Sequence, residues 1–268
     1  MKGILKGIGF FFLYFILMMI FQSLSSIGFM GIAAAKGCRD EQQIVDFANK
    51  NLLGVTVISG ILIVLVFFLI FRIRKSDVKK EWKLRKTDRT YFLLSISVSF
   101  SYSLLFYLLT YNASIENSLM IHDSVGYYSG IFPGLGIIMM IINLIVIAPV
   151  SEEIALRGIV YTRIEKTANP ITAIIVSSVF FGLIHLMAGG IILVAGSFIM
   201  GAVFGIVFYK TNSLLACFIA HAAANLPDFI FYGNPELPGG LMILLEILSC
   251  AVFIFGIIFL IRKKTANS

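Results

Sequence analysis

The sequence predicts an all-α membrane protein, a polytopic helical bundle of about eight transmembrane helices with both termini in the cytoplasm. Three observations predict it: the composition, the lengths of the apolar stretches and the placement of the basic residues. Of the 268 residues, 59% are hydrophobic and 13% are charged, whereas soluble domains have about 45–50% apolar and about 25% charged residues. With a mean hydropathy of +0.98, this excludes a nucleic-acid-binding domain, a disulfide-stapled secreted module and a disordered chain.

Eight apolar stretches are candidate spans, because about 20 residues cross a bilayer as a helix. They cover 8–34, 52–71, 91–111, 137–165, 171–188, 190–209, 213–232 and 241–261. The first follows Lys2 and Lys6 and ends in small residues, as a signal peptide does, but its length favours a retained helix. The fourth contains Pro149, which predicts a kink or an interfacial start.

The basic residues are unevenly distributed over the segments that join these stretches. If the N-terminus is cytoplasmic, 17 of the 21 Lys and Arg residues lie on the cytoplasmic side, nine of them within 72–89. The outer loops 112–128 and 233–240 contain no Lys or Arg. Positive charge marks cytoplasmic loops, so the asymmetry supports eight spans. We also expect loop 72–89 to attract anionic lipids.

The chain is expected to be a single membrane domain, 1–268, in three parts. Residues 1–128 hold spans one to three with the basic loop, 137–232 hold the polar core, and 241–268 hold the last span and a basic tail. No internal repeat of the kind that transporters show is visible. The three cysteines, an odd number with two in apolar stretches, do not suggest a disulfide framework.

Ionisable and amide side chains inside the apolar stretches collect in the second half of the chain. A charged residue at a helix centre costs about 2.5–3.5 kcal/mol on the insertion scale, so each is a functional candidate. Span four carries Glu152, Glu153 and Arg157; span five carries His185; span seven carries His221, Asn225 and Asp228; span eight carries Glu246. The sequence assigns no definite role to Asp228 or Glu246.

Spacing separates the two adjacent carboxylates. Glu153 and Arg157 are four residues apart, so they share a helix face and can form an ion pair. Glu152 is turned by about 100° from Glu153 and lacks that partner. We therefore expect one neutralised carboxylate and one free carboxylate.

Depth brings residues of three helices to one level. Counted from the cytoplasmic end of its span at 1.5 Å per residue, Glu152 lies about 21 Å deep, and His185 and Asn225 lie about 22 Å deep. His221 lies about 16 Å deep on the same count. Unrelated polar residues would scatter in depth, so this convergence predicts one site.

Three motifs carry a family resemblance. Glu152–Arg157 fits EExxxR, Phe181–His185 fits FxxxH and His221–Asn225 fits HxxxN. In this order on membrane helices, they resemble the CAAX-protease and bacteriocin-processing (CPBP, Abi) family of intramembrane endopeptidases, which includes the Rce1-type prenyl proteases. The resemblance implies an endopeptidase of the bacterial plasma membrane that acts in peptide maturation or bacteriocin self-immunity.

Peptide hydrolysis needs an activated water and donors for the tetrahedral oxyanion. Glu152 is the candidate base, and His185 can hold or polarise the same water. His221 and Asn225 are the candidate oxyanion donors, as the resemblance also implies. Two further residues would orient the helix and tune the base: Glu153 and Arg157.

Alternatives remain open at this point. Glu152, His185 and His221 could instead hold Zn²⁺ with an open position for water; the sequence has no HExxH motif, and we favour the metal-free glutamate mechanism, with no cofactor required. The expected partners are a peptide or protein-tail substrate and the bilayer, with no nucleic acid. Competing functions are a non-catalytic membrane regulator and a transporter. The sequence leaves the substrate, the cleavage position and the oligomeric state open.

Overall fold

The computed structural model describes residues 2–112, 128–129, 134–231 and 237–264, and every element in these ranges is helical. Most of the predicted loop 112–128 and the end of the basic tail lie outside them. The first part contains α1 (Lys2–Ala35), α2 (Glu41–Lys50), α3 (Leu52–Ile73), α4 (Val78–Glu81) and α5 (Arg89–Asn112).

The second part begins with one long segment in which α-helical and π-helical turns alternate. It consists of α7 (Leu135–Ile141), the π turn η1 (Ile142–Ile147), α8 (Ala148–Glu153), the π turn η2 (Ile154–Tyr161) and α9 (Thr162–Glu165). The remaining helices are α10 (Pro170–Ile184), α11 (Leu186–Thr211), α12 (Leu214–Ala224), α13 (Leu226–Ile230) and α14 (Gly239–Arg262).

The prediction of an all-α polytopic bundle is confirmed. Within the described residues, six helices are long and apolar enough to cross a membrane: Gly3–Ala35, Leu52–Ile73, Arg89–Thr110, Leu135–Glu165, Gly190–Thr211 and Gly239–Arg262. Two shorter apolar helices, Pro170–Ile184 and Leu214–Ile230, correspond to predicted spans five and seven. The count of eight spans and the cytoplasmic position of both termini stay predictions.

The two short helices begin at well-formed caps. Asn169 accepts a hydrogen bond from the Thr172 amide at 2.9 Å and precedes Pro170 at the first position of α10. Ser213 caps α12 by accepting from the Ala216 amide at 3.3 Å. Both caps satisfy an amide that has no partner within its own helix, which fixes where α10 and α12 start.

Helices α10 and α11 form a tight antiparallel pair that glycines make possible. A Cβ at Gly182 would lie 2.8 Å from the carbonyl oxygen of Val194, and one at Gly201 would lie 3.0 Å from the Cα of Ser178. Close backbone approach at small residues is typical of membrane helices. Gly190 instead lies in the first part of α11, where its φ of +68° favours glycine.

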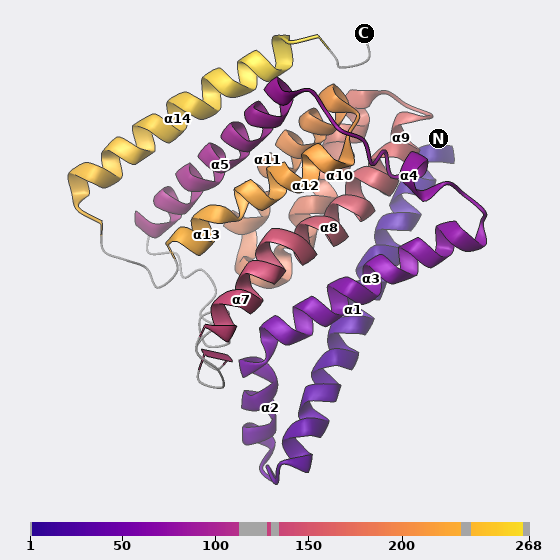
Figure 1. Cartoon of the computed structure of the whole chain (residues 1–268), viewed down its shortest axis with the longest axis vertical. Coiled ribbons are helices and arrows are strands. Elements are labelled where there is room, and N and C mark those ends of the chain that lie inside the picture. Colours follow the sequence, from indigo (N-terminus) through magenta and orange to yellow (C-terminus); the bar gives the residue numbers. More distant parts are fainter. Residues whose placement is uncertain (1, 113–127, 130–133, 232–236, 265–268) are drawn as a thin grey trace.

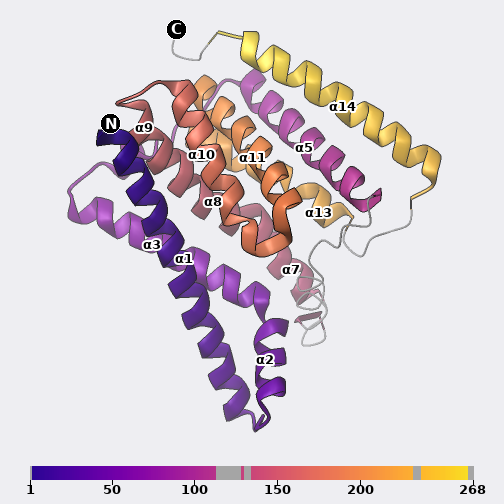
Figure 2. The same cartoon turned by 180° about the vertical axis from the view of Figure 1, so that it is seen from behind.

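Figure 1 shows how the helices are grouped. Helices α1 and α3 pack together, and with α2 they form a hairpin whose tip extends away from the other helices (Figures 1 and 2). Helices α5 and α14 lie side by side at the opposite edge. The long segment of α7 to α9 lies between these groups and contacts α3, α10 and α12.

Segments predicted to be cytoplasmic meet at one end of the bundle. Arg163 pairs with Glu81 at 3.3 Å, and Lys83 pairs with Glu165 at 3.4 Å. The Arg85 Nε donates to the Asn212 carbonyl at 2.7 Å. The first turn of α1 and the last turn of α14 lie near this end in Figures 1 and 2. Loop 72–89 thus ties the ends of α9 and α11 together.

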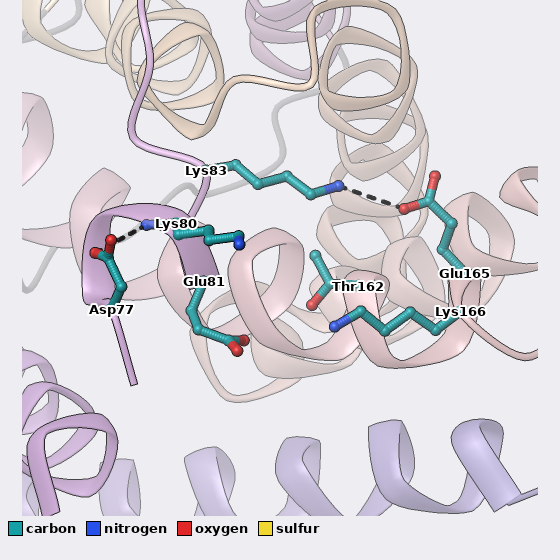
Figure 3. Close-up of a pocket in the computed structure, with 7 residues that line it drawn as sticks. All are labelled: Asp77, Lys80, Glu81, Lys83, Thr162, Glu165 and Lys166. Carbon is teal, nitrogen blue, oxygen red and sulfur yellow. Dashed lines mark hydrogen bonds and ion pairs between the residues drawn. The ribbon is translucent and has the colours of Figure 1, made fainter. Parts of the chain in front are cut away.

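A cavity of about 280 Å³ opens between this loop and α9 (Figure 3). It is lined by Asp77, Lys80, Glu81, Lys83, Thr162, Glu165 and Lys166. Burial lowers the pKa of the Lys83 ammonium, and the Glu165 carboxylate opposes that shift. The cavity lining thus includes both lysine ammonium groups and carboxylates.

Candidate active site

Four of the six predicted site residues lie where a helix ends or changes type, while Arg157 lies within η2 and His221 within α12. Glu152 and Glu153 are the last two residues of α8, directly before the π turn η2. His185 is the C-cap of α10, and Asn225 is the C-cap of α12. Pro227 lacks an N–H to continue the bonding of α12, which explains the break at Asn225. These four side chains therefore lie where the regular helical hydrogen bonding is interrupted.

Glu153 is the centre of the cluster. Its Oε1 accepts a hydrogen bond from Arg157 Nη1 at 3.0 Å and another from His221 Nδ1 at 3.0 Å. The side chains of Glu153 and Arg157 are 0% exposed. The predicted ion pair is confirmed, whereas the bond between Glu153 and His221 was not predicted. A fully buried pair of this kind depends on both partners, since removal of one leaves an uncompensated charge.

Arg157 has further partners that hold its guanidinium in place. Its Nη2 donates to the Gly201 carbonyl at 2.6 Å, across to α11. Its Cζ lies 4.9 Å from the centroid of the Phe181 ring and 5.3 Å from that of the Phe204 ring. Aromatic faces attract a desolvated cation. The guanidinium is thus fixed by a carboxylate, a carbonyl and two rings.

The His221 ring lies between the two carboxylates. Its Nδ1 bonds to Glu153, and its Nε2 lies 4.0 Å from Glu152 Oε2. The ring stacks on Phe204 at a centroid distance of 4.8 Å. Because a carboxylate accepts, Nδ1 carries the proton, so Nε2 is an acceptor in the neutral ring and a donor only in the imidazolium.

Glu152 has a different environment from its neighbour. Its side chain is 17% exposed. Its Oε2 is buried and has no hydrogen-bond partner in the described part of the chain. The Oε2 of Glu153 likewise has no hydrogen-bond partner among the described residues. The two carboxylates differ in that Glu153 is fully buried and bonded twice at Oε1, whereas Glu152 is partly exposed and outside the ion pair, as the helical spacing predicted.

His185 lies next to this cluster through an intervening ring. Its Nδ1 donates to the Phe181 carbonyl at 2.8 Å, so its Nε2 is the acceptor when the ring is neutral. The Phe181 ring lies 4.9 Å from the His185 ring and 5.4 Å from the His221 ring. Phe181 thus packs the site, as the sequence predicted.

Asn225 has a partner that the sequence did not predict. Its Nδ2 donates to the Leu144 carbonyl at 2.7 Å. The Ala148 amide donates to the Asn143 carbonyl, five residues earlier rather than four, as in a π turn. The next donor in that pattern would be Pro149, which has no N–H. The Leu144 carbonyl therefore has no amide donor from its own helix, and the Asn225 side chain donates to it instead.

The three candidate zinc ligands do not form a metal-binding group. In the described ranges, no three His, Cys, Asp or Glu side chains are placed to hold a metal ion. Glu152 and His221 face each other, but His185 does not join them as a third ligand. We therefore derive no step through zinc.

The other intramembrane carboxylates lie on helices other than those that carry the cluster. Asp228 is exposed on α13. Glu246 lies on α14, which packs mainly on α5 and α11.

The sequence did not predict three parts of the site: the Leu144 and Gly201 carbonyls and the Phe204 ring. Backbone acceptors leave no signal in a residue pattern, and one more phenylalanine among 25 is not informative.

Comparison with known proteins finds a match to one family over part of the chain. Residues 134–227 match the family model of type II CAAX prenyl endopeptidase Rce1-like proteins. This segment is similar to Rce1-like domains. It contains all six predicted site residues and the Leu144 and Gly201 carbonyls that bind them. With the apolar helices, this similarity shows that the chain is an integral membrane protein.

One relative extends beyond this domain. A protein of Mycoplasma capricolum subsp. capricolum, described as an uncharacterized protein, is 27% identical over 218 residues. The match covers 77% of this chain and 63% of the relative, so the chain spans less than two thirds of that protein. No solved structure matches.

Proposed function

We propose that the chain is an intramembrane endopeptidase that hydrolyses a peptide bond in a membrane-presented peptide or protein tail. One observation carries the proposal: two adjacent carboxylates at the end of α8 lie in unlike environments. Glu153 is fully buried and bonded to Arg157 and His221, whereas the Glu152 side chain is 17% exposed and has His221 Nε2 at 4.0 Å from its Oε2. Titratable neighbours with separated roles are typical of acid–base sites.

Glu152 acts as the general base in this proposal. A water donates a proton to the carboxylate while its oxygen attacks the scissile carbonyl carbon, whose π electrons move to the carbonyl oxygen. The carboxyl group then returns the proton to the amide nitrogen as the C–N bond breaks. The products are a carboxylic acid and an amine, so atoms and charge balance. General acid–base catalysis contributes about 10²–10⁴-fold.

His221 stabilises the oxyanion as an imidazolium. Its Nδ1 proton is held by Glu153, so an N–H at Nε2 requires the second proton. With that proton, the charges of Arg157, Glu153, His221 and Glu152 sum to zero, which suits a buried cluster. Glu153 and Arg157 therefore orient the ring and compensate its charge.

Asn225 and His185 complete the proposed machinery. The Asn225 amide has two N–H groups; one binds Leu144, and the second serves as the other oxyanion donor. The Nε2 of a neutral His185 accepts a hydrogen bond from the attacking water. Both residues lie at helix ends, where they are held by a backbone carbonyl rather than by another side chain.

Anionic lipid is the proposed partner at the cytoplasmic face. In the cavity of Figure 3, Lys83 pairs with Glu165, and Asp77 accepts from the amides of α4. Lys80 and Lys166 also line it, and loop 72–89 is strongly basic. A lipid phosphate at this level would hold the loop against the membrane surface.

We also propose that the protein resides in a bacterial plasma membrane and acts in peptide maturation or bacteriocin self-immunity.

The test uses purified full-length protein in detergent or vesicles. The substrates are a library of fluorogenic peptides, including farnesylated C-terminal tails, and the matched variant is Glu152→Gln. We expect cleavage by the wild-type protein, none by the variant, and equal thermal stability. A non-catalytic regulator would not need this carboxylate, so an unchanged cellular phenotype in Glu152→Gln would favour that alternative.

Metal removal separates the two mechanisms. The glutamate mechanism predicts that cleavage survives exhaustive chelation. A zinc enzyme would lose activity and regain it with added Zn²⁺. One zinc per chain that is lost in His185→Ala would overturn the metal-free mechanism while leaving the endopeptidase function in place.

A further inference from the structure

The cavity between loop 72–89 and α9 presents two lysine side chains that lack an acceptor (Figure 3). Lys80 extends into it from α4 and Lys166 from the end of α9, so that their ammonium groups face the same space. Neither ammonium has an ion-pair partner within the described part of the chain. Like charges that share a cavity repel each other, so an anion between them would be favoured.

The carboxylates of the lining do not supply this anion, because each has donors of its own. Glu165 pairs with Lys83 at 3.4 Å. Glu81 pairs with Arg163 at 3.3 Å. Asp77 Oδ1 accepts from two backbone amides of α4 at 3.0 and 3.3 Å. The two lysines that remain are therefore the groups that a ligand would bind.

The position and size of the cavity indicate the source of the anion. Lys166 directly follows Leu135–Glu165, a segment long and apolar enough to cross a membrane. It therefore lies at the level of the lipid headgroups, where anionic phosphates attract basic side chains. The volume of about 280 Å³ is close to the lower end of the range for small-ligand pockets, about 300–1,000 Å³. This size and the polar lining suit a phosphate headgroup rather than an acyl chain.

The loop that forms the cavity also holds the helix that carries His221. The Lys83 carbonyl accepts from the Leu214 amide at 3.1 Å, at the start of α12. The Ser213 hydroxyl donates to the Arg85 carbonyl. The first turn of α12 is therefore bonded to the loop, about two helical turns before the His221 ring.

The same loop contacts the π turn η2, which carries Arg157. Trp82 is 5% exposed, and its ring meets the Phe71 ring edge-on at a centroid distance of 6.0 Å. A Cβ at Gly158 would lie 3.4 Å from Leu214 Cδ2 and 3.8 Å from Trp82 Cδ1. The loop, η2 and the first turn of α12 thus meet at one point. Because such packing is tight, a shift of the loop would move two elements that carry groups of the catalytic cluster.

We propose that the cavity is a regulatory site for the phosphate of an anionic membrane lipid. The phosphate bridges Lys80 and Lys166, offsets their repulsion and holds loop 72–89 against α9. The loop then keeps α12 in register with η2, so that His221 stays in place against the two carboxylates. The inference rests on the proposed endopeptidase function, and it adds control of the cleavage rate to the lipid contact described above.

The test compares purified protein in vesicles of phosphatidylcholine alone and in vesicles that also contain phosphatidylglycerol. We expect phosphatidylglycerol to raise kcat. The cavity variant, Lys80→Gln with Lys166→Gln, should bind the anionic lipid about 30-fold more weakly, about fivefold for each lysine. It should lose the activation and keep the wild-type rate in phosphatidylcholine.

The control variant is Lys79→Gln with Lys86→Gln. It removes the same charge from the same loop, but neither residue lines the cavity. It should keep the activation. Equal behaviour of the two variants would overturn the proposal, because the lipid effect would then depend on the total charge of the loop and not on the cavity.

Trp82 supplies a readout that needs no substrate, because it is the single tryptophan of the chain. Its emission should change with the phosphatidylglycerol content of the vesicles in the wild type and the control variant, but not in the cavity variant. Inorganic phosphate added to phosphatidylcholine vesicles should change neither emission nor kcat. A response to it as large as that to phosphatidylglycerol would overturn the assignment to lipid.

The two readouts separate this inference from the proposed function. If wild-type protein cleaves no peptide, the proposed function fails, and the emission of Trp82 still decides whether the cavity binds the lipid phosphate. In protein that cleaves peptides, an emission change without a change in kcat would overturn the regulatory role.

Discussion

Helix α14 and the segment of α7 to α9 are both long enough to cross a membrane, but their backbones differ. Gly239–Arg262 is one continuous α-helix whose apolar side chains are largely exposed, Phe255 at 73%. Leu135–Glu165 alternates between α and π turns and contains a fully buried ion pair. A continuous helix satisfies its own backbone groups, whereas an interrupted one leaves carbonyls for side chains to bind.

The difference shows where polar chemistry is placed in this protein. In the interrupted segment, an open carbonyl at Leu144 receives Asn225, and the end of α8 presents two carboxylates. Helix α14 has no such interruption. In these two segments, interruption accompanies a buried charged pair, and continuity accompanies a largely apolar surface. Four groups of substitutions, each compared with a matched variant, test this comparison.

The largest effect is expected from loss of the proposed catalytic groups. Glu152→Gln, His185→Ala and His221→Ala should each lower the cleavage rate by about 10²–10⁴-fold or more, since acid–base and oxyanion contributions are lost. Folded protein should remain, as measured by circular dichroism. Glu246→Gln is the matched control on α14 and should keep activity. Similar losses from Glu246→Gln would break the contrast between the two helices.

The next effect concerns the buried pair. Glu153→Ala or Arg157→Ala should cost about 3–5 kcal/mol in the free energy of unfolding, because the remaining partner is a buried unpaired charge. Lys83→Ala, which breaks a partly exposed pair, should cost about 0–1 kcal/mol. Denaturation in detergent or vesicles measures both. Equal costs would mean that burial does not determine how much each ion pair contributes to the free energy of unfolding.

A smaller effect is expected at the glycine contact between α10 and α11. Gly201→Ala should destabilise the protein by about 1–3 kcal/mol through overpacking, because its Cβ would lie 3.0 Å from Ser178 Cα. It should also loosen Arg157, which donates to the Gly201 carbonyl. Gly28→Ala, with nothing within 4 Å of its Cβ, should instead stabilise α1 by about 0.5–1 kcal/mol. The same sign for both would argue against a tight contact.

The smallest effect is expected on the continuous helix. Phe255→Ala should change the unfolding free energy by no more than about 0.5 kcal/mol, because surface positions contribute little. Phe181→Ala is the buried counterpart, at 2% exposure, and should cost about 3–5 kcal/mol. A loss above 1 kcal/mol for Phe255→Ala would show that this face of α14 is in contact with another molecule.

Much of the fold could be predicted because a bilayer constrains sequence strongly. Apolar stretches of about 20 residues and the basic loops give the bundle directly. The pair of Glu153 and Arg157 follows from helical spacing alone. Depth counting also put residues of spans four and seven at one level, and the structure joins them through His221.

The rest depends on backbone detail that side-chain patterns do not encode. Depth could not say which carboxylate His221 would bind; the structure bonds its Nδ1 to Glu153, 68 residues away along the chain. The π turns shift bonding from four to five residues without any marker except Pro149. The partner of Asn225 is consequently a carbonyl that no motif includes.

Because of the π turn at Ile142–Ile147, the number of residues in this stretch matters more for the site than which apolar residues they are. Such a turn is an α-helix with one residue inserted. Deleting one residue would restore the α-helical hydrogen bonding and rotate the part of the helix before the deletion by about 100° relative to the part after it. The Leu144 carbonyl would then no longer face Asn225. One apolar residue can replace another in this stretch, whereas a single-residue deletion would separate two parts of the site that no substitution nearby could rejoin.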